Sequence, residues 1–184
     1  TTLFNAYVWG AQLEELSYAT SYIPTYGTVR TRLQDSVTGA GTSSDFNSAE
    51  GVLFAEVAVL ETGRITISDG TEANRITIDV NADGSITGFV NVNSVTQYTF
   101  YESGQSVFNY NKIAVKYKEN DFSVFINGTI YDVDTSGSTF ATNTLTSLSF
   151  NNGVGGNPFF GKTSQIQVFN TALSDFELTQ LTTI

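Results

Sequence analysis

The side chains that most often carry catalysis and metal binding are missing from this sequence. Its 184 residues include no cysteine and no histidine, which excludes thiolate nucleophiles, imidazole general bases, disulfides and the commonest transition-metal ligands. Eighteen Asp and Glu residues remain. Any metal ion would therefore be held by oxygen, and any other ligand would be recognised by carboxylate, amide, hydroxyl, arginine and aromatic groups.

One oxygen-rich segment has the pattern of the first half of a calcium loop. Asp79, Asn81 and Asp83 alternate along Asp79-Val80-Asn81-Ala82-Asp83-Gly84-Ser85, as in the start of an EF-hand loop. The bidentate Glu of the twelfth position is replaced by Val90, which favours the alternative, a hairpin turn between two strands. Ca²⁺ is the one cofactor that the sequence leaves open, with Asp79, Asn81 and Asp83 as its candidate ligands.

Three groups of residues are candidates for binding a sugar. Such a site needs an aromatic side chain over the apolar face of the sugar ring, with Asn, Asp or Arg beside it to bind hydroxyl groups. For each group there is a structural alternative, since surface arginines often only balance acidic neighbours. The candidates are Arg64, Asp69, Asn74 and Arg75 around one strand connection, Tyr22 and Tyr26 in a proline-containing loop, and Asn151 and Asn152 at the start of a glycine-rich loop.

The charge of the chain limits its partners. Eight Lys and Arg residues stand against 18 Asp and Glu residues, and the net charge is -10. Nucleic acids and anionic membranes bind through Lys and Arg, so this surface would repel them. No apolar run approaches the roughly 20 residues that cross a bilayer. We expect neither nucleic-acid binding nor membrane insertion, whereas an uncharged glycan, another protein or a cation suits this charge.

Short β-rich runs, separated by Gly, Asn, Asp and Ser, predict an antiparallel all-β sandwich. Ile65 and Ile67 alternate with polar residues, as do Ile76 and Ile78, which predicts one buried and one solvated face. The length suits a single domain over 1–184, with an opening segment at 1–35, a sandwich core at 46–170 and a short helix at 174–182. The expected strands are 51–59, 63–68, 75–80, 86–92, 97–101, 112–117, 122–126, 129–133, 145–150 and 164–169.

Two local motifs are specific. Asn127-Gly128 lies between two apolar runs and predicts a tight hairpin with a type I′ turn, because both central residues of that turn need positive φ. Ser174 and Glu177 have the spacing of a capping box and predict a helix from about Asp175 to Leu181.

Several blocks of the chain resemble laminin G-like domains of the concanavalin A-like superfamily. The first two resemble the central hairpin, and the next two resemble the closing strand and short helix. The last is similar to an opening segment of phage structural proteins and secreted marine bacterial proteins. The blocks are 111–117, 122–128, 160–170, 172–178 and 9–25.

The resemblance implies a two-sheet jelly roll whose members bind glycans or proteins. Catalytic relatives cleave polysaccharides with close carboxylates, which retaining glycosidases hold about 5 to 5.5 Å apart. No tight Glu-x-Asp-x-x-Glu cluster occurs here, and the pairs Glu14/Glu15 and Asp132/Asp134 do not form one. We therefore expect a binding module and not an enzyme.

The sequence thus predicts a lectin-like module that attaches a phage particle or a secreted bacterial protein to a polysaccharide or cell-surface glycan. Its expected location is extracellular or on a virion, where other chains of a larger assembly are further partners. A structural or oligomerising virion domain is the first alternative. A polysaccharide lyase or hydrolase with a tyrosine-centred site is the second.

Overall fold

The computed structural model describes residues 22, 24, 26–30 and 37–184. The chain forms two compact units, Thr1–Ser36 and Val37–Ile184. The single domain expected over 1–184 stays a prediction. The strands and the helix of the described residues all lie in the larger unit.

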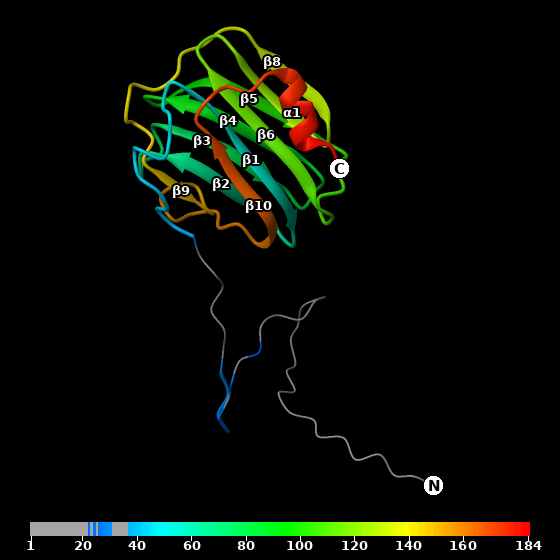
Figure 1. Cartoon of the computed structure of the whole chain (residues 1–184). Coiled ribbons are helices and arrows are strands. Elements are labelled where there is room, and N and C mark those ends of the chain that lie inside the picture. The colour runs from blue at the N-terminus through cyan, green and yellow to red at the C-terminus, as the bar shows by residue number, and fades with distance from the viewer. Residues whose placement is uncertain (1–21, 23, 25, 31–36) are drawn as a thin grey trace. The chain divides into compact units, whose positions relative to one another are not determined.

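Two antiparallel five-stranded sheets face each other in the larger unit (Figure 1). Sheet A has the order β5-β4-β3-β2-β9 and sheet B the order β10-β1-β6-β7-β8. Sheet A is built from β2 (Gly63–Ser68), β3 (Arg75–Val80), β4 (Ile86–Val92), β5 (Val95–Glu102) and β9 (Ser147–Ser149). Sheet B is built from β1 (Glu50–Val59), β6 (Asn111–Lys118), β7 (Phe122–Ile126), β8 (Thr129–Asp134) and β10 (Gly161–Phe169). The predicted all-β sandwich is confirmed.

All ten expected strands are present, and their ends differ where pairing extends or limits them. β5 is longer than expected, because Val95 and Glu102 pair with the two ends of β4. β9 is shorter, because only Ser147–Ser149 pairs with β2. β10 begins three residues early, at Gly161, which pairs with Val59 of β1. Hydrogen bonds to a neighbouring strand therefore set these boundaries.

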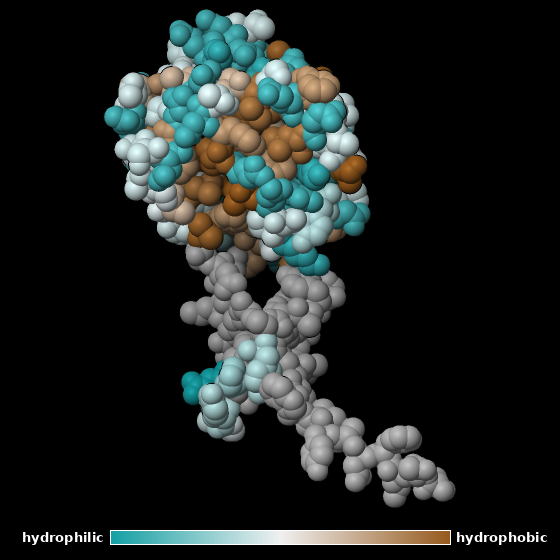
Figure 2. Space-filling view, in the orientation of Figure 1, coloured by the Kyte–Doolittle hydropathy of each residue, from teal (hydrophilic) through white to brown (hydrophobic). Residues whose placement is uncertain are grey.

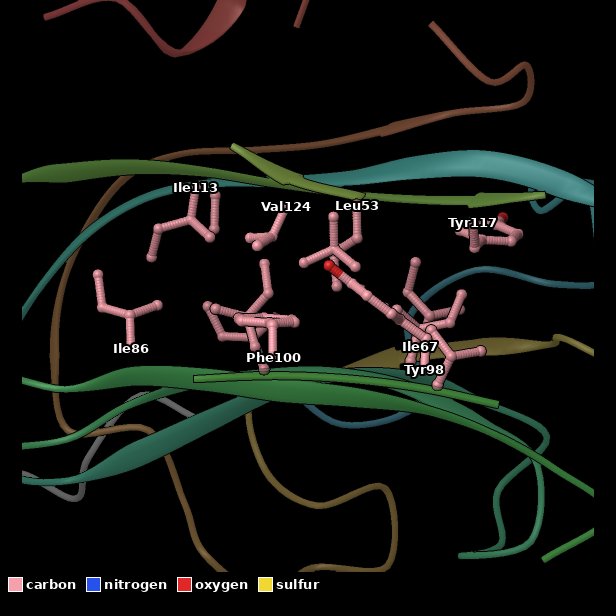
Figure 3. Packing of buried hydrophobic residues seen from close by; sticks show 14 of the residues in the cluster. Leu53, Ile67, Ile86, Tyr98, Phe100, Ile113, Tyr117 and Val124 are labelled. Atoms are coloured by element: carbon pink, nitrogen blue, oxygen red, sulfur yellow. The ribbon is translucent and has the colours of Figure 1, made fainter. Parts of the chain in front are cut away.

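Apolar side chains from both sheets fill the space between the layers. In Figure 3, Leu53, Ile113 and Val124 from sheet B point toward Ile86 and Phe100 from sheet A. The rings of Tyr98 and Phe122 stack across this space with centroids 5.7 Å apart. Because side chains alternate along a strand, this packing also decides which residues face outward.

The hairpin and helix motifs form as predicted. Asn127 and Gly128 have φ of 51° and 81°, and they connect the paired residues Ile126 and Thr129. Both φ values are positive, as a type I′ turn requires. The predicted tight hairpin is therefore confirmed.

The helix α1 (Asp175–Thr182) lies on the outer face of sheet B, against β6, β7 and β8 (Figure 1). Ser174 and Glu177 form the reciprocal bonds of a capping box. Buried Leu178 joins Ala114 of β6 and Phe125 of β7 in a second, smaller apolar cluster, which also contains Val52 and Phe54 of β1. Figure 2 shows hydrophobic residues gathered in the middle of the face that carries α1. Within the described residues, no helix is long and apolar enough to cross a membrane.

The central packing can be tested with a matched pair of leucines. Leu53 is fully buried between the sheets, whereas Leu60 is 37% exposed at the end of β1. Leu53→Ala removes buried methyl groups and leaves a cavity, so it should lower the free energy of unfolding by about 2–5 kcal/mol. Leu60→Ala should cost much less. Urea denaturation of both variants measures the difference, and equal losses would contradict the packing described here.

Candidate functional site

The outer face of sheet A carries a row of four side chains, one from each of four adjacent strands. Arg64 of β2 pairs with Asp79 of β3, Asp79 pairs with Thr87 of β4, and Thr87 pairs with Tyr101 of β5. Their neighbours Ile65, Ile78, Ile86 and Phe100 point into the core. Residues directly opposite in a sheet point to the same side, so these four residues form one row on the outer face, called here the polar row.

Arg64 and Asp79 form a two-point ion pair within the polar row. Nη2 of Arg64 donates to Oδ2 of Asp79 at 2.9 Å, and Nε of Arg64 donates to Oδ1. The two side chains are 18% and 10% exposed. Burial raises the pKa of the Asp79 carboxyl above its ordinary value, and the Arg64 guanidinium counters that rise. The pair is thus a fixed, partly desolvated unit with both donor and acceptor capacity.

A second arginine joins Arg64 over the ring of Phe89 on β4. The guanidinium carbons of Arg64 and Arg75 lie 5.2 Å and 4.9 Å from the centroid of that ring. This is the distance range of cation–π attraction. The backbone N–H of Phe89 also donates to the Thr77 hydroxyl on β3 at 3.1 Å. The ring therefore contacts both arginines on this face, and the backbone of the same residue bonds β4 to β3.

The segment between β9 and β10 is bound onto the other end of the same face. Arg75 donates to the Asn152 carbonyl at 3.1 Å and lies 3.4 Å from Glu72, which also accepts the Asn152 side-chain amide. The Thr66 hydroxyl donates to the Asn151 carbonyl at 2.6 Å. The side chain of Asn151 accepts from the backbone of Gly153 and of Gly155. The segment is consequently fixed in shape and in place.

The segment between β9 and β10 covers part of the outer face of sheet A, so the expectation that this face is solvated is wrong there. Thr66, Ser68 and Thr77 point away from the core, yet all three are fully buried. A Cβ atom at Gly153 would lie 2.9 Å from the Ser68 hydroxyl, which shows how closely the segment approaches β2. Side chains of β2 and β3 thus alternate between two faces that are both largely buried. The inner face is apolar and the outer face is polar.

A pocket of about 270 Å³ lies at the uncovered part of the polar row. Its polar atoms come from one ion pair, two amides and two hydroxyls, so the pocket offers both donors and acceptors. Tyr101 follows the pocket residue Thr87 along the row and is 69% exposed. The lining residues are Thr62, Gly63, Arg64, Asp79, Asn81, Thr87 and Asn157.

The structure brings together four of the eight predicted ligand-binding residues. Arg64, Arg75, Asn151 and Asn152 gather on the outer face of sheet A through the contacts above, although only Arg64 lines the pocket. Their role in binding stays a prediction.

Asp69 and Asn74 lie in the turn between β2 and β3, where they serve the turn itself. The Asn74 amide donates to Asp69 at 2.9 Å, and the other Asp69 oxygen accepts from the backbone and hydroxyl of Thr71. Tyr22 and Tyr26 belong to the Thr1–Ser36 unit. Both tyrosine side chains are exposed there.

The predicted metal ligands do not fit a calcium ion as they are placed. Asp79 is engaged by the Arg64 cation, and the Asn81 amide donates to Ser85 and Thr87. Oδ1 of Asp83 accepts from both the backbone and the hydroxyl of Ser85. Among the described residues, no group of three or more acidic, His or Cys side chains could hold a metal. The segment is a hairpin turn between β3 and β4, which was the alternative interpretation.

Sequence reasoning missed Thr87, Phe89 and Tyr101. The sequence of β4 and β5 does contain a signal that these three side chains point outward. Each lies two positions along the strand from another polar or aromatic residue, and such residues share one face of the sheet. Register was needed to see that Tyr101 follows Thr87 and that Phe89 lies beside two arginines. Asn157 and Thr62 carry no such signal, since they belong to loops.

Comparisons with known proteins identify the fold. No protein-family model matches the chain, and a search of curated proteins found no match. The chain is similar to the Ruminococcus gnavus IT-sialidase CBM40, a carbohydrate-binding module, with TM-score 0.65 and 16% identity over 82% of this chain and 98% of that chain. At this identity the likeness shows the fold alone, a sandwich of two antiparallel β-sheets.

Two further structures have the same fold. The leech intramolecular trans-sialidase, complexed with 2,7-anhydro-Neu5Ac, matches with TM-score 0.63 and 17% identity over 81% of this chain and 26% of that chain. Domain 4 of AbnA, a GH43 extracellular arabinanase from Geobacillus stearothermophilus, in complex with arabinotriose, matches with TM-score 0.56 and 15% identity over 77% and 70% of the two chains.

The ion pair in the polar row gives a pH-dependent prediction. Arg64→Met leaves the Asp79 carboxylate desolvated and unpaired, so the variant should lose about 3 kcal/mol of unfolding free energy at pH 7. Its folded state then has a raised Asp79 pKa and binds a proton more tightly than the unfolded state. The deficit should therefore shrink as the pH falls from 7 to about 4.

Urea denaturation at both pH values measures this deficit, with Lys118→Met as the matched control. Lys118 pairs with Glu50 at 3.1 Å, but its side chain is 50% exposed, so its loss should cost less than about 1 kcal/mol. The double variant Arg64→Met/Asp79→Asn should recover part of the loss at pH 7. A deficit for Arg64→Met that grows on acidification would show that Asp79 is not desolvated as described.

Proposed function

We propose that this protein is a non-catalytic carbohydrate-binding module that holds a saccharide on the outer face of sheet A. The saccharide occupies the pocket beside Arg64 and Asp79 and extends along the polar row to Tyr101. In this role the module attaches a larger secreted protein, or a phage particle, to a polysaccharide or cell-surface glycan outside the cell.

The observation that carries the proposal is the continuity of the polar row. A sugar presents hydroxyl groups that both donate and accept hydrogen bonds, and it also has an apolar ring face. The pocket supplies amide, hydroxyl, guanidinium and carboxylate groups, and Tyr101 supplies an exposed aromatic surface next to Thr87. Both requirements of a sugar site are thus met by neighbouring residues of one sheet face.

The length of the row favours an oligosaccharide over a single sugar. The row crosses four adjacent strands, from β2 to β5. Three interstrand spacings amount to about 14 Å. A ligand that reaches both the pocket and Tyr101 must therefore lie across the strands.

Rigid positioning supports binding by a preformed surface. Arg64 is held by Asp79 and by the ring of Phe89, and the covering segment is tied to Thr66, Arg75 and Glu72. Side chains that are already ordered lose little entropy when a ligand binds.

The number of carboxylates at the pocket favours a binding site over a hydrolase site. Asp79 is the single carboxylate among the residues that line the pocket, and it is paired with Arg64. A retaining glycosidase needs two carboxyl groups about 5–5.5 Å apart, one of them free to act as a nucleophile. Solved structures with the same fold include CBM40 bound to α2,3-sialyllactose and the arabinanase domain with arabinotriose, which also supports a saccharide ligand.

Tyr101 provides the direct test of this proposal. Tyr101→Ala removes the aromatic surface of the row and should weaken binding to any glycan captured on an array by about tenfold or more, equivalent to about 1.4 kcal/mol. Phe176→Ala is the matched control, because Phe176 is 74% exposed on α1, on the outer face of the other sheet. Thermal unfolding of both variants checks the fold. Equal affinities for the wild type and Tyr101→Ala would place the glycan elsewhere.

Chelation tests the part played by metal. The side chains of the Asp79–Ser85 turn are engaged by one another and by Arg64, so glycan binding should be unchanged when calcium is replaced by a chelator. An array measured under both conditions gives the result. Loss of binding in the chelator would show that a calcium ion takes part. No binding in either condition, with folded protein, would favour a structural domain that contacts other protein chains.

A further inference from the structure

The segment that contains β2 to β5 is acidic, because its connections carry carboxylates without compensating cations. Residues 60–105, which include β2 to β5 and the connections between them, contain two arginines and six carboxylates, a net charge of -4. The two arginines are Arg64 and Arg75. The six carboxylates are Glu61, Asp69, Glu72, Asp79, Asp83 and Glu102. Any ligand on this face meets a negative field, within a chain whose total net charge is -10.

Both arginines on this face have their charge compensated. Arg64 forms the two-point ion pair with Asp79. Arg75 lies 3.4 Å from Glu72, donates to the Asn152 carbonyl and contacts the ring of Phe89. Neither guanidinium is therefore a free cation of the kind that binds a carboxylate or sulfate group.

The four lysines of the large unit lie on the other sheet. Lys112, Lys116 and Lys118 are on β6 and Lys162 is on β10, all in sheet B. Lys112 donates to the Thr183 carbonyl, Lys116 contacts Asp121 and Asp175, and Lys118 contacts Glu50. These contacts are on the sheet that carries α1, away from the polar row.

The pocket itself suits hydroxyl groups. Asn81, Asn157, Thr62 and Thr87 contribute neutral polar groups to its lining. A pair such as Arg64 and Asp79 can donate to one hydroxyl and accept from its neighbour. An anionic ligand at the same position would gain a contact with Arg64 only by approaching the Asp79 carboxylate, and like charges at short distance repel.

We infer that the site selects neutral saccharides and discriminates against carboxylated or sulfated ones. The inference rests on the proposed function and names the ligand class of the same site. Its cause is the internal pairing of Arg64 and Arg75, which leaves the face with donors and acceptors but without a net positive charge. Binding of the neutral saccharide also forms no new ion pair, so its affinity depends little on salt.

The test measures matched neutral and anionic saccharides against the full chain. The probes are lactose with α2,3-sialyllactose, and galactan with galacturonan oligosaccharides, together with neutral arabinotriose, at 20 mM and 500 mM salt. We expect binding to at least one neutral probe. We expect the anionic member of its pair to bind at least about tenfold more weakly at low salt, with affinity for the neutral member nearly constant between the two salt concentrations.

Two results overturn the inference and leave the proposed function standing. One is tighter binding of an anionic probe than of its neutral partner, with an affinity that falls as salt rises. The other is equal binding of both members of a pair. A third result, no binding of any saccharide by folded protein, removes the proposed function and this inference together.

Variants that release the arginines sharpen the test. Asp79→Asn frees Arg64, and Glu72→Gln removes the charge that pairs with Arg75 while leaving an oxygen that can accept from the Asn152 amide. Each should improve α2,3-sialyllactose binding by about threefold or more relative to wild type. Glu119→Gln is the control, because it makes the same change in net charge at an exposed position after β6. An equal improvement in Glu119→Gln would show that total charge, and not arginine pairing, sets the preference.

Discussion

The apolar layer between the two sheets is the constraint on which the rest of this structure depends. Leu53, Ile113 and Val124 from one sheet pack against Ile86 and Phe100 from the other. A shift of one residue in any strand would turn its apolar side chains outward, at a cost of about 1.5–3 kcal/mol for each large side chain exposed. The register is therefore set by the core, and the outward-facing residues are placed as a consequence. The polar row of Arg64, Asp79, Thr87 and Tyr101 exists because their neighbours in the chain must be buried.

The outer face of sheet A also shows how polar groups can be buried without a large penalty. Thr66 and Thr77 are fully buried, yet the hydroxyl of the first donates to Asn151 and that of the second accepts from Phe89. An unpaired buried hydroxyl would cost about 1–3 kcal/mol. The covering segment after β9 supplies the carbonyl that Thr66 needs, and the same segment receives Arg75. The covering segment and the candidate site thus share one network of hydrogen bonds.

That network bears on function because it holds the site in one shape. The Arg64 guanidinium has its direction set by Asp79 and by the ring of Phe89, so it cannot turn freely toward an incoming anion. The exposed Tyr101 lies on the edge strand of the sheet, at the end of the polar row. The proposed binding of a neutral saccharide depends on this fixed arrangement of paired charges.

The sequence by itself determined the local features of this protein, because they depend on neighbours a few residues apart. Alternation and β-rich runs identified the strands 63–68, 75–80 and 86–92 with the observed ends. Asn127-Gly128 specified its turn, and Ser174 with Glu177 specified the helix start. The sequence also singled out Arg64 and Arg75, since cations are scarce in an acidic chain.

Only the tertiary structure decided which distant residues meet. Thr66 and Asn151 are 85 residues apart, yet they bond directly, and β1 pairs with β10 and β6 but with no strand that adjoins it in sequence. Asp79 had the spacing of a metal ligand along the chain, but the strand pairing of β2 with β3 placed Arg64 beside it. Tyr101 became part of the site through three successive strand pairings. Such contacts are selected by the packing of the whole core, which no short stretch of sequence contains.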